Sequence, residues 1–340
     1  MKVFVTGTDG YIGIMLAGHL REHGHQVVGC DTGFYRSGWL YNGVDYLPEA
    51  LSKDIRNVTA EDMRGFDAVI HLAELSNDPL GQLAPNITFD INHKGSTHLA
   101  TLAKQAHVPR FIYFSSCSVY GASDDIIDET GTVNPLTAYA KCKVAVENDL
   151  SAMADDNFTP TYLRNATAYG ASPRQRFDIV VNNLAGHAWT TKQIKMISDG
   201  SPWRPLVHIL DICKAARCVL EAERDVVHNQ RFNVGASSEN YQVRDVAKII
   251  SNVFPNCELS IGDQGGDARN YRVNFDKIKN TVPGFECEWD VPKGAQQLLE
   301  VFDRIKLTKE LFESPHHTRL KQINQLLETG QIDANFFWTR

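Results

Sequence analysis

Three glycines near the start of the chain constrain its fold more than any other feature. Gly7, Gly10 and Gly13 stand in the stretch VFVTGTDGYIG, between a β-branched run and an amphipathic run typical of a helix. Glycines suit such a turn because the backbone must bend tightly and approach a pyrophosphate, whose charge rests on the N–H groups of the following helix. The spacing predicts a dinucleotide-binding strand, turn and helix, and a glycine turn without a ligand is the plainer alternative.

Asp31 indicates which dinucleotide such a turn would hold. It stands at the end of the second apolar run, 21 residues after Gly10. A carboxylate at this place accepts hydrogen bonds from the ribose hydroxyls and repels a 2′-phosphate. We therefore expect NAD in preference to NADP, against the alternative of a solvated carboxylate at a strand end.

The first half of the chain alternates short β-branched runs with helical patterns, which indicates βαβ units and a parallel sheet. Runs such as DAVIHLA and RFIYFSS are almost continuously apolar, as in strands that helices cover on both faces. Strands are expected at 3–6, 26–30, 68–72, 111–115, 161–164 and 231–234. Helices are expected at 11–23, 88–106, 136–153, 180–191 and 211–222, and the chain ends in an amphipathic segment at 320–327. The predicted fold class is α/β, a doubly wound parallel sheet of the Rossmann type.

The alternation loosens after residue 164, in polar segments that contain glycine and proline. The pattern returns briefly, so that the strand at 231–234 can join the same sheet. We therefore predict an NAD-binding domain of residues 1–170 with 204–235. The remaining residues, 171–203 with 236–340, are predicted to form a smaller, discontinuous α/β domain for the substrate.

Composition excludes several classes of protein. The 34 basic and 41 acidic residues give a net charge of −7, which disfavours a surface for nucleic acid polymers. No stretch approaches the roughly 18 apolar residues of a membrane span, and the first residues lack the apolar core of a signal peptide. The seven cysteines are scattered without a C-x-x-C pair. We expect a cytoplasmic protein with reduced thiols, no membrane contact and no metal site.

A second motif, Tyr139-Ala-Lys-Cys-Lys143, combines a phenol and an ammonium group. Residues four apart share one face of a helix, and a nearby ammonium favours the phenolate that a general base for an alcohol requires. The stretch FIYFSSCSVYG lies about twenty residues earlier and brings Ser116 to the edge of the sheet where ligands bind. Ser116, Tyr139 and Lys143 thus form a predicted proton-transfer set, whereas Tyr139 and Lys143 alone could be a solvated surface pair.

These motifs together resemble a known family. TGTDGYIG, Asp54-Ile55-Arg56, HLAE, FSSCSVYG and YAKCK, in this order, are similar to the extended short-chain dehydrogenase/reductases, specifically the NAD-dependent nucleotide-sugar epimerase/dehydratase family. SPWRPLVHILD resembles that family's R-x-x-x-H-x-x-D segment, so that the resemblance covers nearly the whole chain. It implies NAD as cofactor, a nucleotide sugar as substrate, and a homodimer formed through the helices near 88–106 and 136–153.

The resemblance also implies roles for individual residues. The cofactor would be held by Gly7, Gly10, Tyr11, Ile12 and Gly13 at the pyrophosphate, Asp31 at the adenosine ribose, Asp54 and Ile55 at the adenine, Leu72 and Ala73 along its length, and Tyr139 and Lys143 at the nicotinamide end. Ser116, Tyr139 and Lys143 would be catalytic. The substrate would contact Ser116, Thr167, Asn183, Arg204 and Arg269. Arg204 would grip the diphosphate, because a planar guanidinium binds two phosphate oxygens at once.

Departures from the family pattern bear on the reaction. Cys117 and Ser118 stand where dehydratases carry an acidic pair, so a 4,6-dehydratase is disfavoured. Cys117 and His71 are expected to be packing residues, and Glu74 replaces a small residue. The sequence therefore predicts an NAD-dependent nucleotide-sugar 4-epimerase. The alternatives are a nucleotide-sugar ketoreductase or dehydrogenase with the same three catalytic residues, and a regulatory protein that senses NAD without catalysis.

Overall fold

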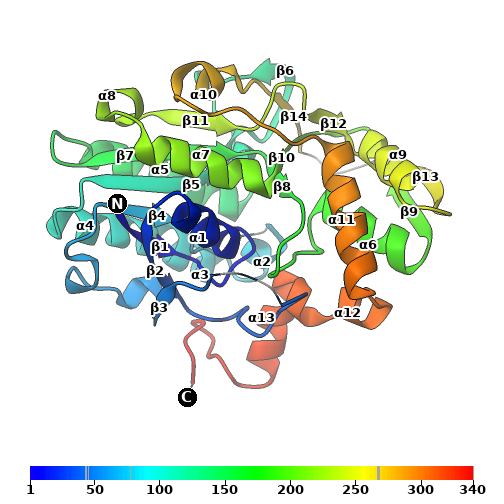
Figure 1. Cartoon of the computed structure of the whole chain (residues 1–340), viewed down its shortest axis with the longest axis horizontal. Coiled ribbons are helices and arrows are strands. Elements are labelled where there is room, and N and C mark those ends of the chain that lie inside the picture. Colours follow the sequence, from blue (N-terminus) through cyan, green and yellow to red (C-terminus); the bar gives the residue numbers. More distant parts are fainter. Residues whose placement is uncertain (43, 45, 77, 266–268, 340) are drawn as a thin grey trace.

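A seven-stranded parallel sheet with the strand order β11-β7-β5-β4-β1-β2-β3 forms the centre of the molecule (Figure 1). The computed structural model describes the chain apart from residues 43, 45, 77, 266–268 and 340. The strands are β1 (Lys2–Thr6), β2 (Gln26–Asp31), β3 (Glu49–Ser52), β4 (Ala68–His71), β5 (Arg110–Ser116), β7 (Thr159–Asn165) and β11 (Arg231–Val234). Each pairs with its neighbours in parallel. The predicted doubly wound α/β fold is confirmed.

Helices cover both faces of this sheet. They are α1 (Gly13–Glu22) and α7 (Ile209–Glu221) on one face, and α4 (Ser96–Gln105) and α5 (Ala138–Met153) on the other (Figure 1). Successive side chains of a strand point to opposite faces. In β1, Val3 and Val5 therefore pack in the core beneath α1 and α7, while Phe4 packs in the core beneath α4 and α5. Both faces are apolar for this reason, as the continuous apolar runs predicted.

The remaining strands form three small sheets. They are β10 (Trp203–His208) between β12 (Asn240–Gln242) and β8 (Thr167–Tyr169), β13 (Glu258–Gln264) with β9 (Gln193–Ser198), and β14 (Asn270–Val273) with β6 (Ala122–Ile127). A second apolar core joins α6 (Val180–Thr190), α9 (Val243–Val253) and α11 (Val291–Ile305). The strand predicted at 231–234 does join the main sheet, as β11. The domain boundaries drawn from the sequence stay a prediction.

Short elements complete the chain. They are α2 (Asp78–Leu83), α3 (Pro85–Thr88), a π-helix (Phe89–Gly95), α8 (Arg224–Val227), α10 (Asp276–Thr281), α12 (Lys309–Glu313), α13 (Arg319–Glu328) and 3-10 turns at Ile55–Asn57, Glu61–Met63, Cys117–Tyr120 and Pro315–His317. None of the helices in the described ranges has the length and apolar character needed to cross a membrane.

The helix predicted at 88–106 is three pieces, because a π-turn interrupts it between α3 and α4. Asn92 lies in that turn, and its side chain accepts a hydrogen bond from Leu75 N (2.8 Å) and donates one to Leu75 O (2.9 Å). The wider turn thus positions an amide that holds the chain after β4. The helix predicted at 136–153 begins at Ala138, because the Thr137 hydroxyl caps it by accepting from Ala140 N.

The C-terminal segment, residues 319–339, returns to the N-terminal part of the sheet and lies below β2 and β3 in Figure 1. Trp338 Nε1 donates a hydrogen bond to Thr32 O (2.7 Å), and Gln322 Nε2 donates one to Phe34 O (3.0 Å). Ile323 and Phe336 share a small apolar core with Phe34. The end of the chain is therefore fastened to the loop that follows β2.

A buried ion pair beneath β5 generates a test of the fold. The Glu147 side chain is only 2% exposed. Its carboxylate forms an ion pair with Arg164 Nη2 (2.6 Å) and accepts a hydrogen bond from Ser115 Oγ (2.6 Å). Glu147→Leu leaves the Arg164 guanidinium buried beside no carboxylate, and we expect it to lower the free energy of unfolding by about 3–5 kcal/mol, measured in urea. The double variant Glu147→Leu/Arg164→Met should lose less. A double variant that is less stable than the single one would contradict this account.

Candidate active site

A cavity of about 780 Å³ opens at the carboxyl edge of the central sheet. The ends of β1, β2, β4, β5 and β7 contribute to its wall, because parallel strands all end at the same edge. The structure brings every residue predicted for the site to this cavity: Gly7, Gly10, Tyr11, Ile12, Gly13, Asp31, Asp54, Ile55, Leu72, Ala73, Ser116, Tyr139, Lys143, Thr167, Asn183, Arg204 and Arg269. Their individual roles stay predictions.

The glycine turn is held in place by backbone hydrogen bonds. Gly7 has a φ of +81°, and its N–H donates to Cys30 O at 2.8 Å. A Cβ atom on Gly13 would lie 2.0 Å from Gly7 O, so a side chain there would displace the turn. The start of α1 thus stands directly beside the turn, with its N-terminus at the cavity. This backbone geometry fits the diphosphate of a dinucleotide.

Asp31 is held at the end of β2 by two backbone donors. Its Oδ1 accepts from Gly33 N (2.8 Å) and its Oδ2 from Asp9 N (2.9 Å). Burial, and then the nearby Asp9 carboxylate, raise the pKa of Asp31 to about 6, although the two amides act in the opposite direction. The carboxylate is therefore ionised at neutral pH and loses its charge in mildly acidic solution.

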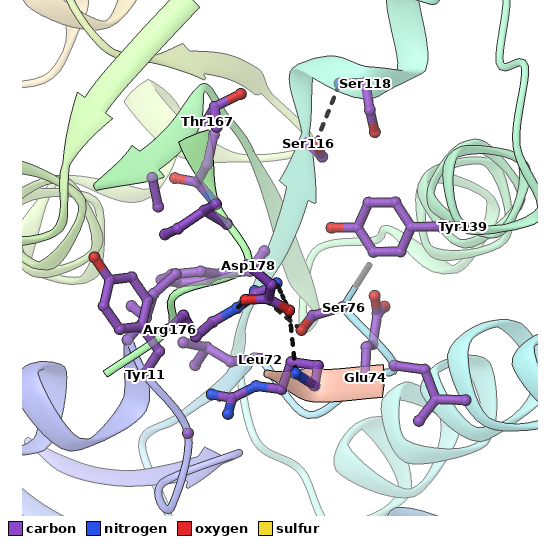
Figure 2. A pocket seen from close by; sticks show the side chains of 18 of the residues that line it. Tyr11, Leu72, Glu74, Ser76, Ser116, Ser118, Tyr139, Thr167, Arg176 and Asp178 are labelled. Carbon is purple, nitrogen blue, oxygen red and sulfur yellow. Dashed lines mark hydrogen bonds and ion pairs between the residues drawn. The ribbon is translucent and has the colours of Figure 1, made fainter. Parts of the chain in front are cut away.

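The three predicted catalytic residues come together from β5 and α5. Figure 2 shows the hydroxyl of Tyr139 directed into the cavity, on the side where Ser116 ends its strand. Ser116 Oγ accepts a hydrogen bond from Ser118 N at 3.1 Å, and Lys143 Nζ lies 5.3 Å from the centre of the Tyr139 ring. A phenol, a hydroxyl and an ammonium so arranged can move a proton to or from an alcohol.

Lys143 is paired with Glu74, a residue expected from the sequence only to replace a small side chain of the family pattern. Glu74 Oε2 lies 2.5 Å from Lys143 Nζ, and its Oε1 accepts from Tyr113 Oη at 2.6 Å. Both side chains of the pair are almost fully buried, and Lys143 Nζ also donates to Phe114 O. Burial lowers the pKa of Lys143, but Glu74 and Tyr139 together raise it above its usual value. Glu74 therefore positions Lys143 and keeps it charged.

The cavity wall contains further residues that the sequence motifs did not indicate. Ser118 Oγ is buried without a hydrogen-bond partner and lines the cavity. Arg176 Nε donates to Asp178 Oδ1 at 2.8 Å, and Arg176 Nη1 donates to Ser76 Oγ at 3.3 Å (Figure 2). The pKa of Asp178 is raised by burial but lowered more by Arg176 and other donors, to about 2. The R-x-D spacing in RQRFDIV was the only local signal for this pair.

The residues expected to pack do so. Cys117 is buried, its Sγ donates to Arg164 O at 3.1 Å, and burial raises the pKa of its thiol. His71 is buried between Thr6 Oγ1 and Ser96 Oγ, each 2.7 Å from a ring nitrogen. Burial lowers the pKa of His71 to about 3, so the ring is neutral. Neither side chain is available as an acid or base for a ligand in the cavity.

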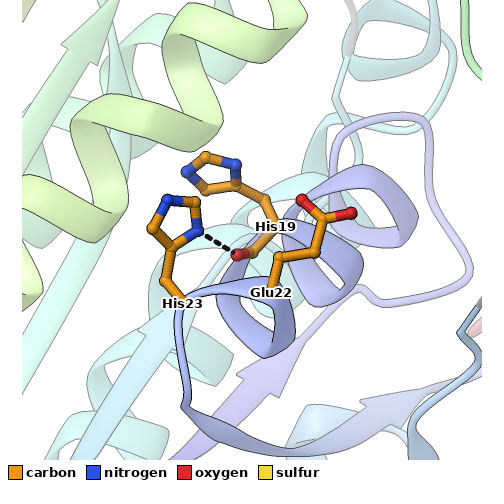
Figure 3. Close-up of side chains that lie close together, drawn as sticks. All are labelled: His19, Glu22 and His23. Carbon is orange, nitrogen blue, oxygen red and sulfur yellow. Dashed lines mark hydrogen bonds between the residues drawn. The ribbon is translucent and has the colours of Figure 1, made fainter.

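Among the residues that the structure describes, one cluster of possible metal ligands lies outside the cavity, at the end of α1 (Figure 3). His19, Glu22 and His23 each offer one ligand atom, all within 4.8 Å of one another. The expectation of no metal site assumed that no two histidines stand at H-x-x-x-H spacing, which is wrong for His19 and His23. His23 Nδ1 donates to His19 O (2.8 Å), and His19 Nε2 accepts from the cationic Arg217 at 3.3 Å. Because that cation would repel a metal ion, we assign none to the cluster.

A Rossmann sheet with a glycine turn, an acidic residue after β2 and a Ser-Tyr-Lys set defines the class of dinucleotide-dependent dehydrogenase-like enzymes. Comparisons identify the family within that class. A family model described as the NAD dependent epimerase/dehydratase family matches residues 3–235. The chain belongs to this family, and its cofactor is NAD.

Individual relatives agree with this assignment. A UDP-glucose 4-epimerase of Mycolicibacterium smegmatis is 30% identical over 319 residues, which are 89% of this chain and 98% of that protein. A UDP-glucose 4-epimerase of Corynebacterium glutamicum is 28% identical over 269 residues, 74% of this chain and 80% of that protein. The solved structure of MoeE5 in complex with UDP-glucose and NAD has the same fold, with a TM-score of 0.77 at 24% identity over 90% of this chain and all of that chain.

Asp31 generates a prediction about cofactor binding and pH. Asp31 is the predicted ligand of the ribose hydroxyls, and a carboxylate accepts hydrogen bonds more strongly when it is ionised. Its pKa of about 6 means that it takes up a proton as the pH falls. NAD affinity should therefore be constant above pH 7 and fall by up to about tenfold per pH unit below 6. Titration of NAD between pH 5 and 8 measures this. Asp31→Asn should remove the dependence and improve NADP relative to NAD, and a slope that persists in Asp31→Asn would contradict it.

Glu74 generates a prediction about the pH profile. The Glu74 carboxylate disfavours the phenolate form of Tyr139, because it is negative and balances part of the Lys143 charge. The other titratable groups around the Glu74–Lys143 pair are Tyr113, His71 and Cys142. Glu74→Gln keeps the shape and removes the charge. We expect the acidic limb of kcat/KM to move to lower pH in this variant, with Tyr113→Phe as a control that leaves the carboxylate in place. A shift to higher pH would contradict this expectation, because it would show that the weaker charge on Lys143 outweighs the removal of the carboxylate from the surroundings of Tyr139.

Proposed function

We propose that the protein is a nucleotide-sugar 4-epimerase that keeps its NAD throughout the catalytic cycle. The observation that carries the proposal is a single cavity lined by the glycine turn, by Ser116 and Tyr139, and by the two arginines Arg204 and Arg269. A cofactor and a second diphosphate ester can thus meet at one proton-transfer set. The two relatives that are UDP-glucose 4-epimerases support this choice of reaction.

Each catalytic residue has one task in this reaction. NAD, when bound, supplies the acceptor and donor of the hydride at the sugar C4. Tyr139 Oη, as phenolate, takes the proton of the 4-hydroxyl and returns it to the ketone oxygen after the sugar has presented its other face. Ser116 Oγ donates a hydrogen bond to that oxygen, and Lys143 sustains the phenolate by its charge.

The arginines suit the diphosphate of the substrate. Arg204 lies on β10 and is almost fully buried at the cavity wall, where Nη1 donates to Trp203 O (2.7 Å) and to Arg269 O. Arg269 also lines the cavity, just before β14. Asn183 is fixed by a bond from its Nδ2 to Phe177 O (2.9 Å), so its amide is already oriented. These groups favour a phosphate ester over an uncharged sugar.

Two features distinguish the proposed reaction from its alternatives. The place of the acidic pair of dehydratases holds Cys117, which is buried away from the cavity, and Ser118, which is neutral. A regulatory protein has no need of the Ser-Tyr-Lys set, which the chain retains at its cavity. A ketoreductase would use the same three residues, so it stays the second candidate, and only the fate of the cofactor separates the two.

The proposal predicts the outcome of a substrate panel. The purified full chain, incubated with UDP-, GDP-, CDP- and dTDP-sugars, should convert at least one of them to its C4 epimer by NMR, with no net change in absorbance at 340 nm. Tyr139→Phe should reduce turnover about 10²- to 10⁴-fold without loss of NAD binding. Tyr46→Phe is the matched control, because its hydroxyl bonds to Val27 O away from the cavity.

Other outcomes would contradict it. Stoichiometric formation of NADH or NAD during turnover would show the ketoreductase or dehydrogenase reaction. A product that has lost water would show a dehydratase. NAD binding without turnover on the whole panel would refute the proposed epimerase and favour the regulatory alternative.

A further inference from the structure

Arg319 is a buried cation at the cavity that comes from outside the part of the chain matched by the family. It is the first residue of α13, well beyond residue 235. Only 3% of Arg319 is exposed, and it lines the cavity with Asp31 and Tyr35. Its guanidinium carbon lies 3.9 Å from the centre of the Tyr35 ring. The C-terminal segment thus contributes one charged group to the wall of the cofactor cleft.

The charge of Arg319 is not balanced by a partner of its own. Among the described residues its guanidinium makes no hydrogen bond or ion pair, and only its backbone N–H donates to Asp178 Oδ2 (3.1 Å). The Asp178 carboxylate already pairs with Arg176 through Nε (2.8 Å) and Nη2 (3.2 Å). Burial and repulsion by Arg176 lower the pKa of Arg319 to about 10. Asp178 is taken up by Arg176, and Asp31 acts on Arg319 without forming an ion pair with it, so the buried Arg319 guanidinium can accept a further anion.

Arg174 shows what a merely structural arginine looks like in this region. It is also 3% exposed, it stacks on the Trp39 ring at 3.7 Å, and burial lowers its pKa to about 10. Arg174, however, donates to the backbone oxygens of Tyr35 (3.3 Å) and Arg36 and does not line the cavity. Arg319 lacks such acceptors and faces the cleft, which is the arrangement of a ligand-binding cation.

We propose that Arg319 binds the diphosphate of NAD and thereby closes the C-terminal segment over the cofactor. A guanidinium fork binds two phosphate oxygens at once, and the cleft beside the glycine turn is where the dinucleotide diphosphate fits. Asp31 acts electrostatically on Arg319, and Tyr35 stacks on it, so it lies at the adenosine side of the cleft. Arg204, on β10, and Arg269, just before β14, line another wall of the cavity. The proposal rests on NAD as the cofactor and not on the sugar reaction.

The segment that carries Arg319 is fastened at several points. Trp338 and Gln322 donate to the backbone of the loop after β2, at Thr32 and Phe34. Phe177 N donates to His317 O at 2.8 Å, which joins the turn just before the segment to the loop that carries Arg176. Since both sides of the cleft are thus bridged by one segment, an anion held by Arg319 would be retained rather than exchanged quickly.

The test compares ligands with and without a diphosphate. The full chain, stripped of bound nucleotide, is titrated calorimetrically with ADP-ribose, adenosine and UDP, as wild type, Arg319→Met, Arg319→Lys and the matched control Arg174→Met. We expect Arg319→Met to weaken ADP-ribose about 10- to 100-fold and adenosine and UDP less than about twofold. Arg319→Lys should be intermediate, and Arg174→Met should change ADP-ribose by less than about threefold. The fraction of NAD retained on purification should fall in Arg319→Met.

Stability separates binding from a structural role. Removal of an unbalanced buried cation should leave the Tm of the nucleotide-free chain unchanged or raise it, whereas loss of a structural contact lowers it. Unchanged affinity for ADP-ribose in Arg319→Met would overturn the proposal, as would an equal loss for adenosine and ADP-ribose. A loss for UDP with ADP-ribose unaffected would assign Arg319 to the substrate diphosphate. If Arg319→Met does not fold, unchanged ADP-ribose affinity in Arg319→Lys, which keeps the charge without the fork, overturns it.

Discussion

The parallel pairing of β1 with β2 and β4 is the constraint on which the rest of the molecule depends. It sets Thr6 opposite Cys30 on one side and His71 on the other, so that three strands end at one level. The glycine turn and the cavity-lining residues Leu72 and Ala73 follow these ends directly, and Asp31 is the last residue of β2. A one-residue slip in either pairing would turn their side chains away from the cavity. The strand register thus determines which side chains can face the cavity, whatever their identity.

Buried charge is the second constraint. The chain carries a net charge of −7, yet its cavity is lined by several cations that must be balanced locally. Glu74 balances Lys143, and Asp178 balances Arg176, each across 2.8 Å or less. A global charge therefore excludes a polyanion surface without excluding a small phosphate ester, because a few buried guanidinium groups outweigh a distant acidic surface.

The sequence predicted most of the sheet and all residues of the local motifs, because a glycine turn or a Y-x-x-x-K helix is specified by neighbours in the chain. The edge strand β3 was missed, since EALS is largely exposed and has no apolar pattern. Glu74 could be recognised only in three dimensions, because its partner Lys143 is remote in the sequence. The same holds for Arg319, because the cavity that it lines is built mainly from the first part of the chain. Ser118 was considered only as a departure from the acidic pair of dehydratases and not as part of the cavity wall, because the direction of a side chain after a strand depends on the turn that follows.

Cofactor retention is physically linked to the type of reaction, because a 4-epimerase and a ketoreductase place opposite demands on the release of the dinucleotide. A 4-epimerase uses the same dinucleotide twice in one cycle, so a cofactor that escapes between the two hydride transfers leaves a ketone behind. A ketoreductase must release its cofactor at every turnover. A C-terminal segment that is bonded to the loop after β2 and brings a buried guanidinium to the cleft opposes release. The position of Arg319 therefore favours the reaction that needs a resident cofactor, on grounds independent of Ser116, Tyr139 and Lys143, which both reactions would share.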